Sequence, residues 1–129
     1  MDRILRNTVV GTSIALIAGS FATIALAGDA NRGAQVFRGQ CAVCHSSTAG
    51  AGQTVGPKLF GVVGRHAGAQ PGYAYSGAMK KSGLVWTPAE LKIYLANPAG
   101  TVHGNKMPYA GLHNPAQLED LVTYLGSLK

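Results

Sequence analysis

The sequence has few acidic residues, only two cysteines and no stretch of alternating apolar residues long enough to propose a β-strand. Five Asp and Glu stand against eleven Lys and Arg in 129 residues, and the basic residues are scattered. Because there is neither a basic run nor a nucleic-acid recognition motif, we expect no nucleic-acid partner. No repeat is visible, and the length suits a single domain. The sequence therefore predicts one all-α domain.

Residues 1–27 differ in composition from the rest of the chain. Arg3 and Arg6 precede an uncharged apolar run over residues 8–27 that ends in the small-residue pattern Ala25-Leu26-Ala27. This order is typical of a secretory signal peptide, so we predict cleavage before Gly28 and export to a bacterial periplasm. The alternative is an uncleaved membrane anchor, since the run is about as long as a bilayer-spanning helix.

The predicted mature chain, residues 28–129, carries a moderate positive charge. Removing residues 1–27 takes away two basic residues and one acidic residue, which leaves nine against four and a net charge of +5. No second apolar span follows, so we expect no stable membrane insertion after cleavage. Net charge of one sign steers encounter, which favours acidic protein partners.

Three segments carry the signals of helix ends. Asp29 is a candidate N-cap for a first helix that runs toward Cys41. Thr87 and Pro88 predict the start of a second helix, which should end at Asn97-Pro98. A third begins at Asn114-Pro115 and carries an apolar face made of Leu118, Leu121, Val122, Leu125 and Leu128.

The stretch over residues 45–72 is rich in Gly and Ser and contains Pro57 and Pro71. It predicts a long loop, and a loop of this length in a small domain needs something to wrap around. The apolar residues of the three helices make a thin core for about a hundred residues. A large bound cofactor would complete that core.

Cys41-Ala42-Val43-Cys44-His45 forms a C-x-x-C-H run, the signature of c-type haem attachment. Two thiols at this spacing can form thioethers with the two vinyl groups on one edge of a porphyrin, and His45 can then reach the iron. We predict one haem c, bound covalently through Cys41 and Cys44, with His45 as an axial ligand. A redox disulfide is the first alternative, but it is expected near a βαβ pattern, which this chain lacks. A zinc site is the second; it needs two further ligands, whereas the remaining histidines, His66, His103 and His113, stand alone.

The sixth iron ligand decides the function, because iron held by histidine alone is open to small molecules and iron held by histidine and methionine suits electron transfer. Met79 and Met107 are the methionines of the mature chain. Met107 lies in a loop bounded by Gly104 and Pro108, whereas Met79 lies in a predicted short helix. Loop context favours Met107, with Met79, a histidine or an open site as alternatives.

Residues 29–128 resemble the class I cytochromes c, of the small soluble bacterial type related to mitochondrial cytochrome c. Besides C-x-x-C-H, the motifs that carry the resemblance are Gly56-Pro57, Arg65, Tyr75, Trp86, Tyr94, Asn97-Pro98 and Lys106-Met107. The resemblance implies a class I cytochrome c fold over residues 28–129. In this fold, three main helices with short helical turns and long loops wrap around one covalently bound haem.

The resemblance also assigns roles to individual residues. It implies that Met107 is the distal ligand and that the Pro57 carbonyl accepts the Nδ1 proton of His45. Arg65, Tyr75 and Trp86 would face the haem propionates, and the Tyr94 hydroxyl would lie near the Met107 sulfur. Gly33 and Phe37 of the first helix would pack against Leu121 and Tyr124 of the last.

Two groups of residues depart from the mitochondrial pattern. Met79 replaces an asparagine and Asn105 replaces a threonine near the distal ligand. Around the exposed haem edge, lysines common in mitochondrial members are replaced by Gln40, Ala99, Gly100, His113 and Asn114. The docking face is thus less basic, so partner assignments do not transfer directly.

The function implied by the resemblance is that of a soluble, monomeric one-electron carrier, not an enzyme, in a respiratory or photosynthetic chain. Its transient redox partners would be an oxidase, a bc1-type complex, a reaction centre or a dehydrogenase, and the contact would be salt-sensitive. Two alternatives remain open. One is a haem subunit of a dehydrogenase complex, and the other is a haem peroxidase or gas sensor with a displaceable sixth ligand.

Overall fold

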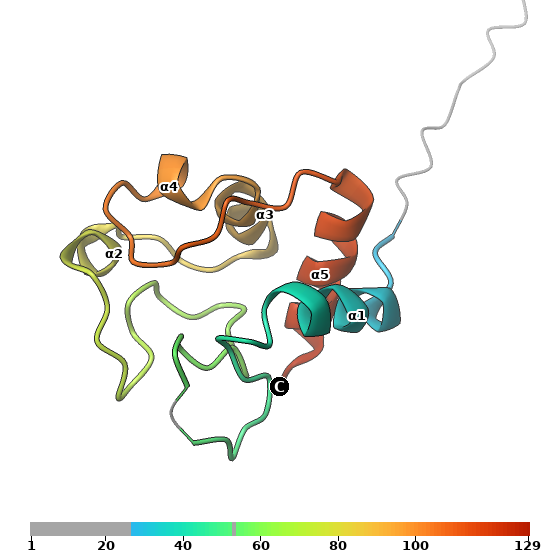
Figure 1. The fold of residues 1–129 in the computed structure, drawn as a ribbon, viewed down its shortest axis with the longest axis horizontal. Helices are drawn as coiled ribbons and strands as arrows, with labels where there is room; N and C mark the ends of the chain where they lie inside the picture. The colour runs from blue at the N-terminus through green and yellow to red at the C-terminus, as the bar shows by residue number, and fades with distance from the viewer. Residues whose placement is uncertain (1–26, 53) are drawn as a thin grey trace, which may run out of the picture.

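The computed structural model describes residues 27–52 and 54–129, so all but Ala27 of the predicted signal peptide lies outside the described residues. Five helices follow one another along this part of the chain (Figure 1), namely α1 (Ala30–Gln40), α2 (Gly77–Lys81), α3 (Pro88–Ala96), α4 (Pro98–Thr101) and α5 (Pro115–Ser127). Within the described ranges no strand forms, and the one β-type pairing is an isolated bridge between His66 and Val85. The prediction of an all-α domain with three main helices is confirmed.

The three predicted N-caps are confirmed. The side chains of Asp29, Thr87 and Asn114 each accept a hydrogen bond from the backbone N–H three residues ahead. These bonds satisfy N–H groups that have no partner inside the helix. α3 ends at Ala96 with Asn97 as its C-cap, as the prediction of an end at Asn97-Pro98 required. The same Asn97-Pro98 pair also begins α4, a helix that was not predicted. The Asn97 side chain caps α4 by accepting from the Gly100 N–H at 3.0 Å.

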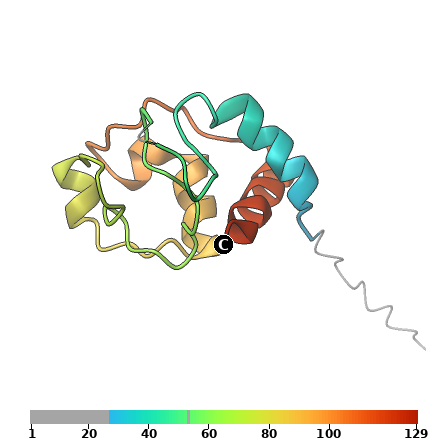
Figure 2. The same cartoon turned by 90° about the horizontal axis from the view of Figure 1, so that it is seen from below.

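The first and last helices, α1 and α5, lie in direct contact (Figures 1 and 2), and Gly33 is at the contact. A Cβ built on Gly33 would lie 2.0 Å from the Asp120 carbonyl oxygen, so any larger residue would push the two backbones apart. Phe37 of α1 also packs on Tyr124 of α5, and the centroids of the two rings lie 5.4 Å apart. Leu121 is 1% exposed in the same region. The predicted packing of Gly33 and Phe37 against the last helix is confirmed.

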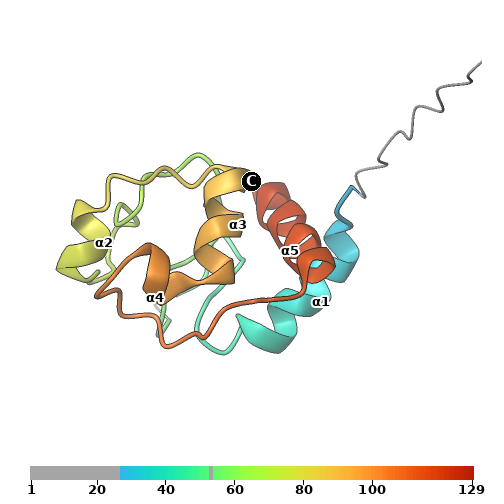
Figure 3. The same cartoon turned by 90° about the horizontal axis from the view of Figure 1, so that it is seen from above.

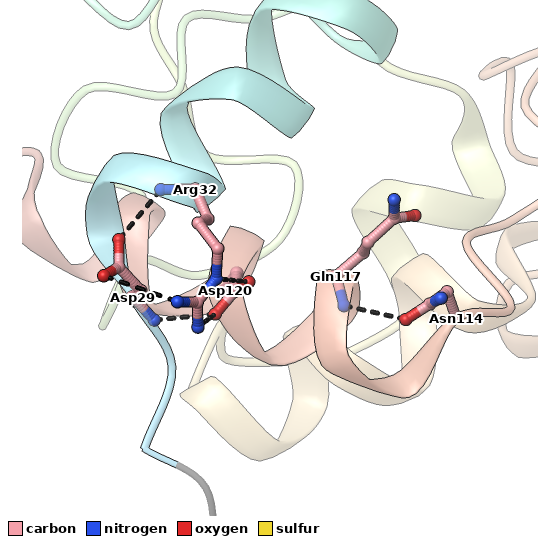
Figure 4. A network of polar contacts seen from close by, with 5 residues as sticks. All are labelled: Asp29, Arg32, Asn114, Gln117 and Asp120. Carbon is pink, nitrogen blue, oxygen red and sulfur yellow. Dashed lines mark hydrogen bonds and ion pairs between the residues drawn. The ribbon is translucent and has the colours of Figure 1, made fainter.

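A buried carboxylate joins the two helices at the start of α1 (Figure 4). Asp120 accepts two hydrogen bonds from the Arg32 guanidinium, at 2.7 and 2.9 Å, and one from the Asp29 N–H at 2.7 Å. The hydrogen bond from Arg32 is the main reason that the pKa of Asp120 lies below its ordinary value, with that from Asp29 adding to it. This network was not predicted, since its members lie about 90 positions apart in the sequence.

The remaining helices and loops lie to one side of the contact between α1 and α5 (Figure 1). α3 packs against α5 and α4, whereas α2 lies at the end of the molecule opposite α1 and α5 (Figures 1 and 3). The predicted loop over residues 45–72 contains no helix in its described parts, residues 45–52 and 54–72. None of the described helices has both the length and the apolar character needed to cross a bilayer.

Candidate functional site

A single cavity brings together the four residues that the sequence predicted for the site. Cys41, Cys44, His45 and Met107 all line it. Most of its other walls are apolar or aromatic, with contributions from Leu59, Val62, Tyr75, Met79, Trp86, Leu91, Tyr94, Leu95, Tyr109, Leu121 and Leu125. The arrangement suits a large, flat and mainly apolar group.

The two cysteines reach the cavity from the turn that follows α1. Cys41 ends that helix, with its N–H bonded to the Phe37 carbonyl, and its own carbonyl accepts from the N–H groups of Cys44 and His45. This turn directs both thiols and the imidazole into the same space. No disulfide joins the two cysteines.

The setting of these thiols argues against the two alternatives for the motif. Burial raises the pKa of the Cys41 thiol to about 11, whereas a redox C-x-x-C depends on a lowered thiol pKa. Over residues 27–52 and 54–129, no three His, Cys, Asp or Glu side chains are grouped so as to hold a metal ion. His66, His103 and His113 are all exposed and do not line the cavity.

His45 is held in one orientation. Its Nδ1 lies 2.7 Å from the Pro57 carbonyl oxygen, which accepts the Nδ1 proton and leaves the Nε2 lone pair free for a metal. Burial lowers the pKa of His45, and the hydrogen bond to Pro57 offsets part of this. A Cβ on Gly56 would lie 2.5 Å from the imidazole Cε1, so only glycine fits beside the ring. The predicted bond to Pro57 is present.

Met107 is positioned by Asn105. The Asn105 side chain accepts from the Met107 N–H at 2.9 Å and donates to the Pro98 and Val102 carbonyls at 3.0 and 2.9 Å. It thereby fastens the methionine loop to the segment that begins with α4. The family resemblance implies a place for Asn105 near the distal ligand, and these contacts show that its side chain holds the backbone of Met107.

Met79 also lines the cavity, from α2, and is 7% exposed. Both methionine side chains are therefore available to a group bound there. Met79 behaves as a buried core residue, whereas Met107 is half-buried in a loop. The choice of Met107 as sixth ligand remains a prediction that rests on the family pattern.

Arg65 supplies a test of whether a haem fits this cavity. Its guanidinium donates to the Lys58 carbonyl at 2.8 Å, to the Phe60 carbonyl at 3.3 Å and to the Gln70 side chain at 2.5 Å. Its Nε is buried and, within the part of the chain that the structure describes, has no hydrogen-bond partner. A half-buried cation with a buried N–H that lacks a partner suits a carboxylate, and haem carries two propionates. The cavity therefore fits haem in both its apolar walls and its charge.

The predicted aromatic residues line the same cavity as Arg65. The rings of Trp86 and Tyr94 pack with centroids 4.9 Å apart. Burial raises the pKa of Tyr94 to about 12, so its hydroxyl stays protonated and can donate a hydrogen bond at neutral pH. Contact of that hydroxyl with the Met107 sulfur stays a prediction, as does contact of Tyr75 and Trp86 with propionates.

Tyr109 is a cavity residue that the sequence reading missed. It follows Met107 by two positions, and its hydroxyl donates to the side chain of Gln40, which directly precedes Cys41. The bond joins the loop of Met107 to the end of α1. The closeness of Tyr109 to Met107 in the sequence could have indicated that it lines the cavity. Nothing in the sequence indicated Gln40 as its partner, because the two residues lie 69 positions apart.

Comparison with known proteins bears on the whole domain. The family model described as Cytochrome c matches residues 30–129. The chain belongs to the cytochrome c family. A cytochrome c2 of Agrobacterium tumefaciens (strain II Chrys) is 46% identical over 101 residues, which is 76% of this chain and 90% of that protein. A cytochrome c of Arabidopsis thaliana is 43% identical over 104 residues, covering 81% and 93% of the two chains.

A solved structure extends the similarity to three dimensions. Cytochrome cH from Methylobacterium extorquens superposes with a TM-score of 0.72 at 44% identity, covering 78% of this chain and 99% of that one. The predicted class I cytochrome c fold is thus confirmed. Members of the family are electron carriers rather than enzymes. They bind haem c covalently, and Cys41 and Cys44 have the spacing of the C-x-x-C-H motif that attaches it.

Proposed function

We propose that this protein is a soluble one-electron carrier whose haem is attached through Cys41 and Cys44 and whose iron is held by His45 and Met107. The observation that carries the proposal is the convergence of these four side chains on one mainly apolar cavity. His/Met ligation closes both axial positions and favours electron transfer over ligand chemistry. When bound, haem c supplies an iron that gains and loses one electron.

The residues around the cavity keep the ligands in place. The Pro57 carbonyl fixes the tautomer of His45, and Asn105 holds the backbone of Met107. The apolar walls exclude water, and the free N–H of Arg65 suits a propionate. No side chain in this set needs to transfer a proton or form a bond during electron transfer.

We further propose that residues 1–27 are a cleaved signal peptide and that residues 28–129 act in the periplasm. Gly28 packs directly on α5, because a Cβ at this residue would lie 2.2 Å from the Thr123 Oγ1, so cleavage before Gly28 would leave this contact intact. Mass spectrometry of a periplasmic extract should find residues 28–129 plus one haem. A mass that retains residues 1–27 in the membrane fraction would favour the anchor.

The carrier is proposed to act as a monomer between redox proteins such as an oxidase, a bc1-type complex, a reaction centre or a dehydrogenase, in a respiratory or photosynthetic chain. When the purified holoprotein is titrated with a chemical reductant, each chain should take up one electron, and reoxidation should remove it again. Turnover of hydrogen peroxide would contradict the carrier and favour a peroxidase. A stable complex on native purification would favour a haem subunit of a dehydrogenase.

A further inference from the structure

The mouth of the cavity is apolar and almost free of charge. Five of the residues that line the cavity are exposed, namely Gln40, Val43, Val55, Lys106 and Pro108; we call these five the rim. Val43 is 82% exposed and Val55 is 76% exposed, and both stand out among the large apolar side chains of the described residues. A single exposed valine is ordinary, but two exposed valines and an exposed proline that line one cavity indicate a contact surface.

The sequence around the rim is depleted of charge over long stretches. Residues 39–57, 93–105 and 107–118 contain no Asp, Glu, Lys or Arg, and each of these segments lines part of the cavity. Lys106 is the exception between the second and third segments. The net charge of +5 on residues 28–129 is therefore carried mostly by other parts of the surface.

Lys106 is turned toward its own chain. Its Nζ donates to the Ala74 carbonyl at 2.5 Å and lies 5.7 Å from the centroid of the Tyr73 ring. A carboxylate on a partner would have to compete with both contacts. Among the described residues, the only other Lys, Arg, Asp or Glu that lines the cavity is Arg65, which is half-buried and bonded to neighbouring carbonyls.

We propose that the rim docks a redox protein whose own contact patch is apolar and uncharged. The inference rests on the proposed carrier function and gives the chemistry of its partner. An acidic patch would meet at most one cation at the rim, whereas an apolar patch would cover Val43, Val55 and Pro108. The acidic partner expected from net charge is thereby replaced, since charges far from a contact act only through long-range steering.

A second copy of this chain is the probe, because its rim has the chemistry proposed for the partner. Electron self-exchange between oxidised and reduced holoprotein is measured by NMR line broadening from about 0.1 M to about 0.5 M salt, where the Debye length is about 10 Å or less and distant charges are screened. Val43→Lys is compared with Ile93→Lys. Ile93 is a matched control because it is also an exposed large apolar residue, 56% exposed on α3, but does not line the cavity.

The expected result is a wild-type rate constant that changes by less than about threefold over this salt range. At the lowest salt, the self-exchange rate constant of Val43→Lys should be about tenfold below that of wild type, because two added cations face one another across the contact. The rate constant of Ile93→Lys should match that of wild type. Equal rates for the two variants, or a wild-type rate that rises about tenfold with salt, would overturn the docking inference alone. Absence of exchange in every form would instead overturn the carrier function on which it rests.

Discussion

The crossing of α1 and α5 allows a stability prediction with an internal control. Gly33→Ala adds a single methyl group at a point where the ideal Cβ lies 2.0 Å from the Asp120 carbonyl oxygen and 2.7 Å from the Tyr124 Cβ. The first of these is a backbone atom, so no side-chain rotation relieves the overlap. The separation must widen from 2.0 Å to at least 3.4 Å, where ordinary contact begins.

That movement would disturb what surrounds the crossing. The packing of Phe37 on Tyr124 and the bonds from Arg32 to Asp120 both span the same two helices. Overpacking a close contact costs about 1–3 kcal/mol, occasionally more. Because the overlap is with backbone, we take the upper end of this range, about 3 kcal/mol. Alanine recovers about 1 kcal/mol of helix propensity over glycine, so we expect a net loss of about 2 kcal/mol in the free energy of unfolding.

The assay is guanidinium unfolding of the holoprotein, followed by circular dichroism, with Gly39→Ala as the control. Gly39 lies in the same helix, but a Cβ there would have no atom outside the helix within 4 Å. This variant should gain up to about 1 kcal/mol. A Gly33→Ala protein with a midpoint at or above that of wild type would refute the assignment of this glycine to a close helix crossing.

Three further predictions concern the ion pair, the methionine loop and the haem attachment. Because the folded pKa of Asp120 lies below the ordinary value of about 3.9, its stabilisation is complete above about pH 4 and is lost as pH falls through the folded pKa. Asp120→Asn should lower the melting temperature at pH 7, and its melting temperature should then drop less than that of wild type when the pH is lowered below about 4. Melting temperatures equal to those of wild type at both pH values would contradict this. Asn105→Ala removes the acceptor of the Met107 N–H, a loss of about 1–2 kcal/mol, so added imidazole should bind the iron about tenfold more tightly; equal affinity would contradict a positioning role. A Cys41→Ser and Cys44→Ser double variant should lose haem staining on denaturing gels, and staining that persists would contradict thioether attachment.

The sequence was informative wherever a structural cause lies within a few residues. The caps at Asp29, Thr87 and Asn114 depend on side chains bonding N–H groups three residues away, so the starts of the main helices were predictable. The C-x-x-C-H run was equally local, because one turn after α1 carries all three reactive side chains. The second start at Pro98 was missed, because an Asn-Pro pair that ends one helix can also cap the next.

The contacts that join distant segments required the structure. Asp120 lies on an otherwise apolar face of α5, and its partners lie near the start of the chain. The bond from Tyr109 to Gln40 likewise spans most of the domain. Pairing of this kind depends on how the helices cross, which periodicity does not encode. The family resemblance supplied the bond between His45 and Pro57, which spacing alone did not indicate.

The proposed closure of both axial iron positions by His45 and Met107 can be tested by the absorption spectrum of the purified holoprotein. Spectra are recorded for the oxidised protein, the reduced protein and the reduced protein with carbon monoxide, beside Met107→Ala and Met79→Leu. We expect a thioether-to-ferric charge-transfer band and no response to carbon monoxide in wild type and Met79→Leu, with band loss and carbon monoxide binding in Met107→Ala. A wild-type protein that lacks the band and binds carbon monoxide rapidly, or a band that disappears only in Met79→Leu, would contradict His45/Met107 ligation.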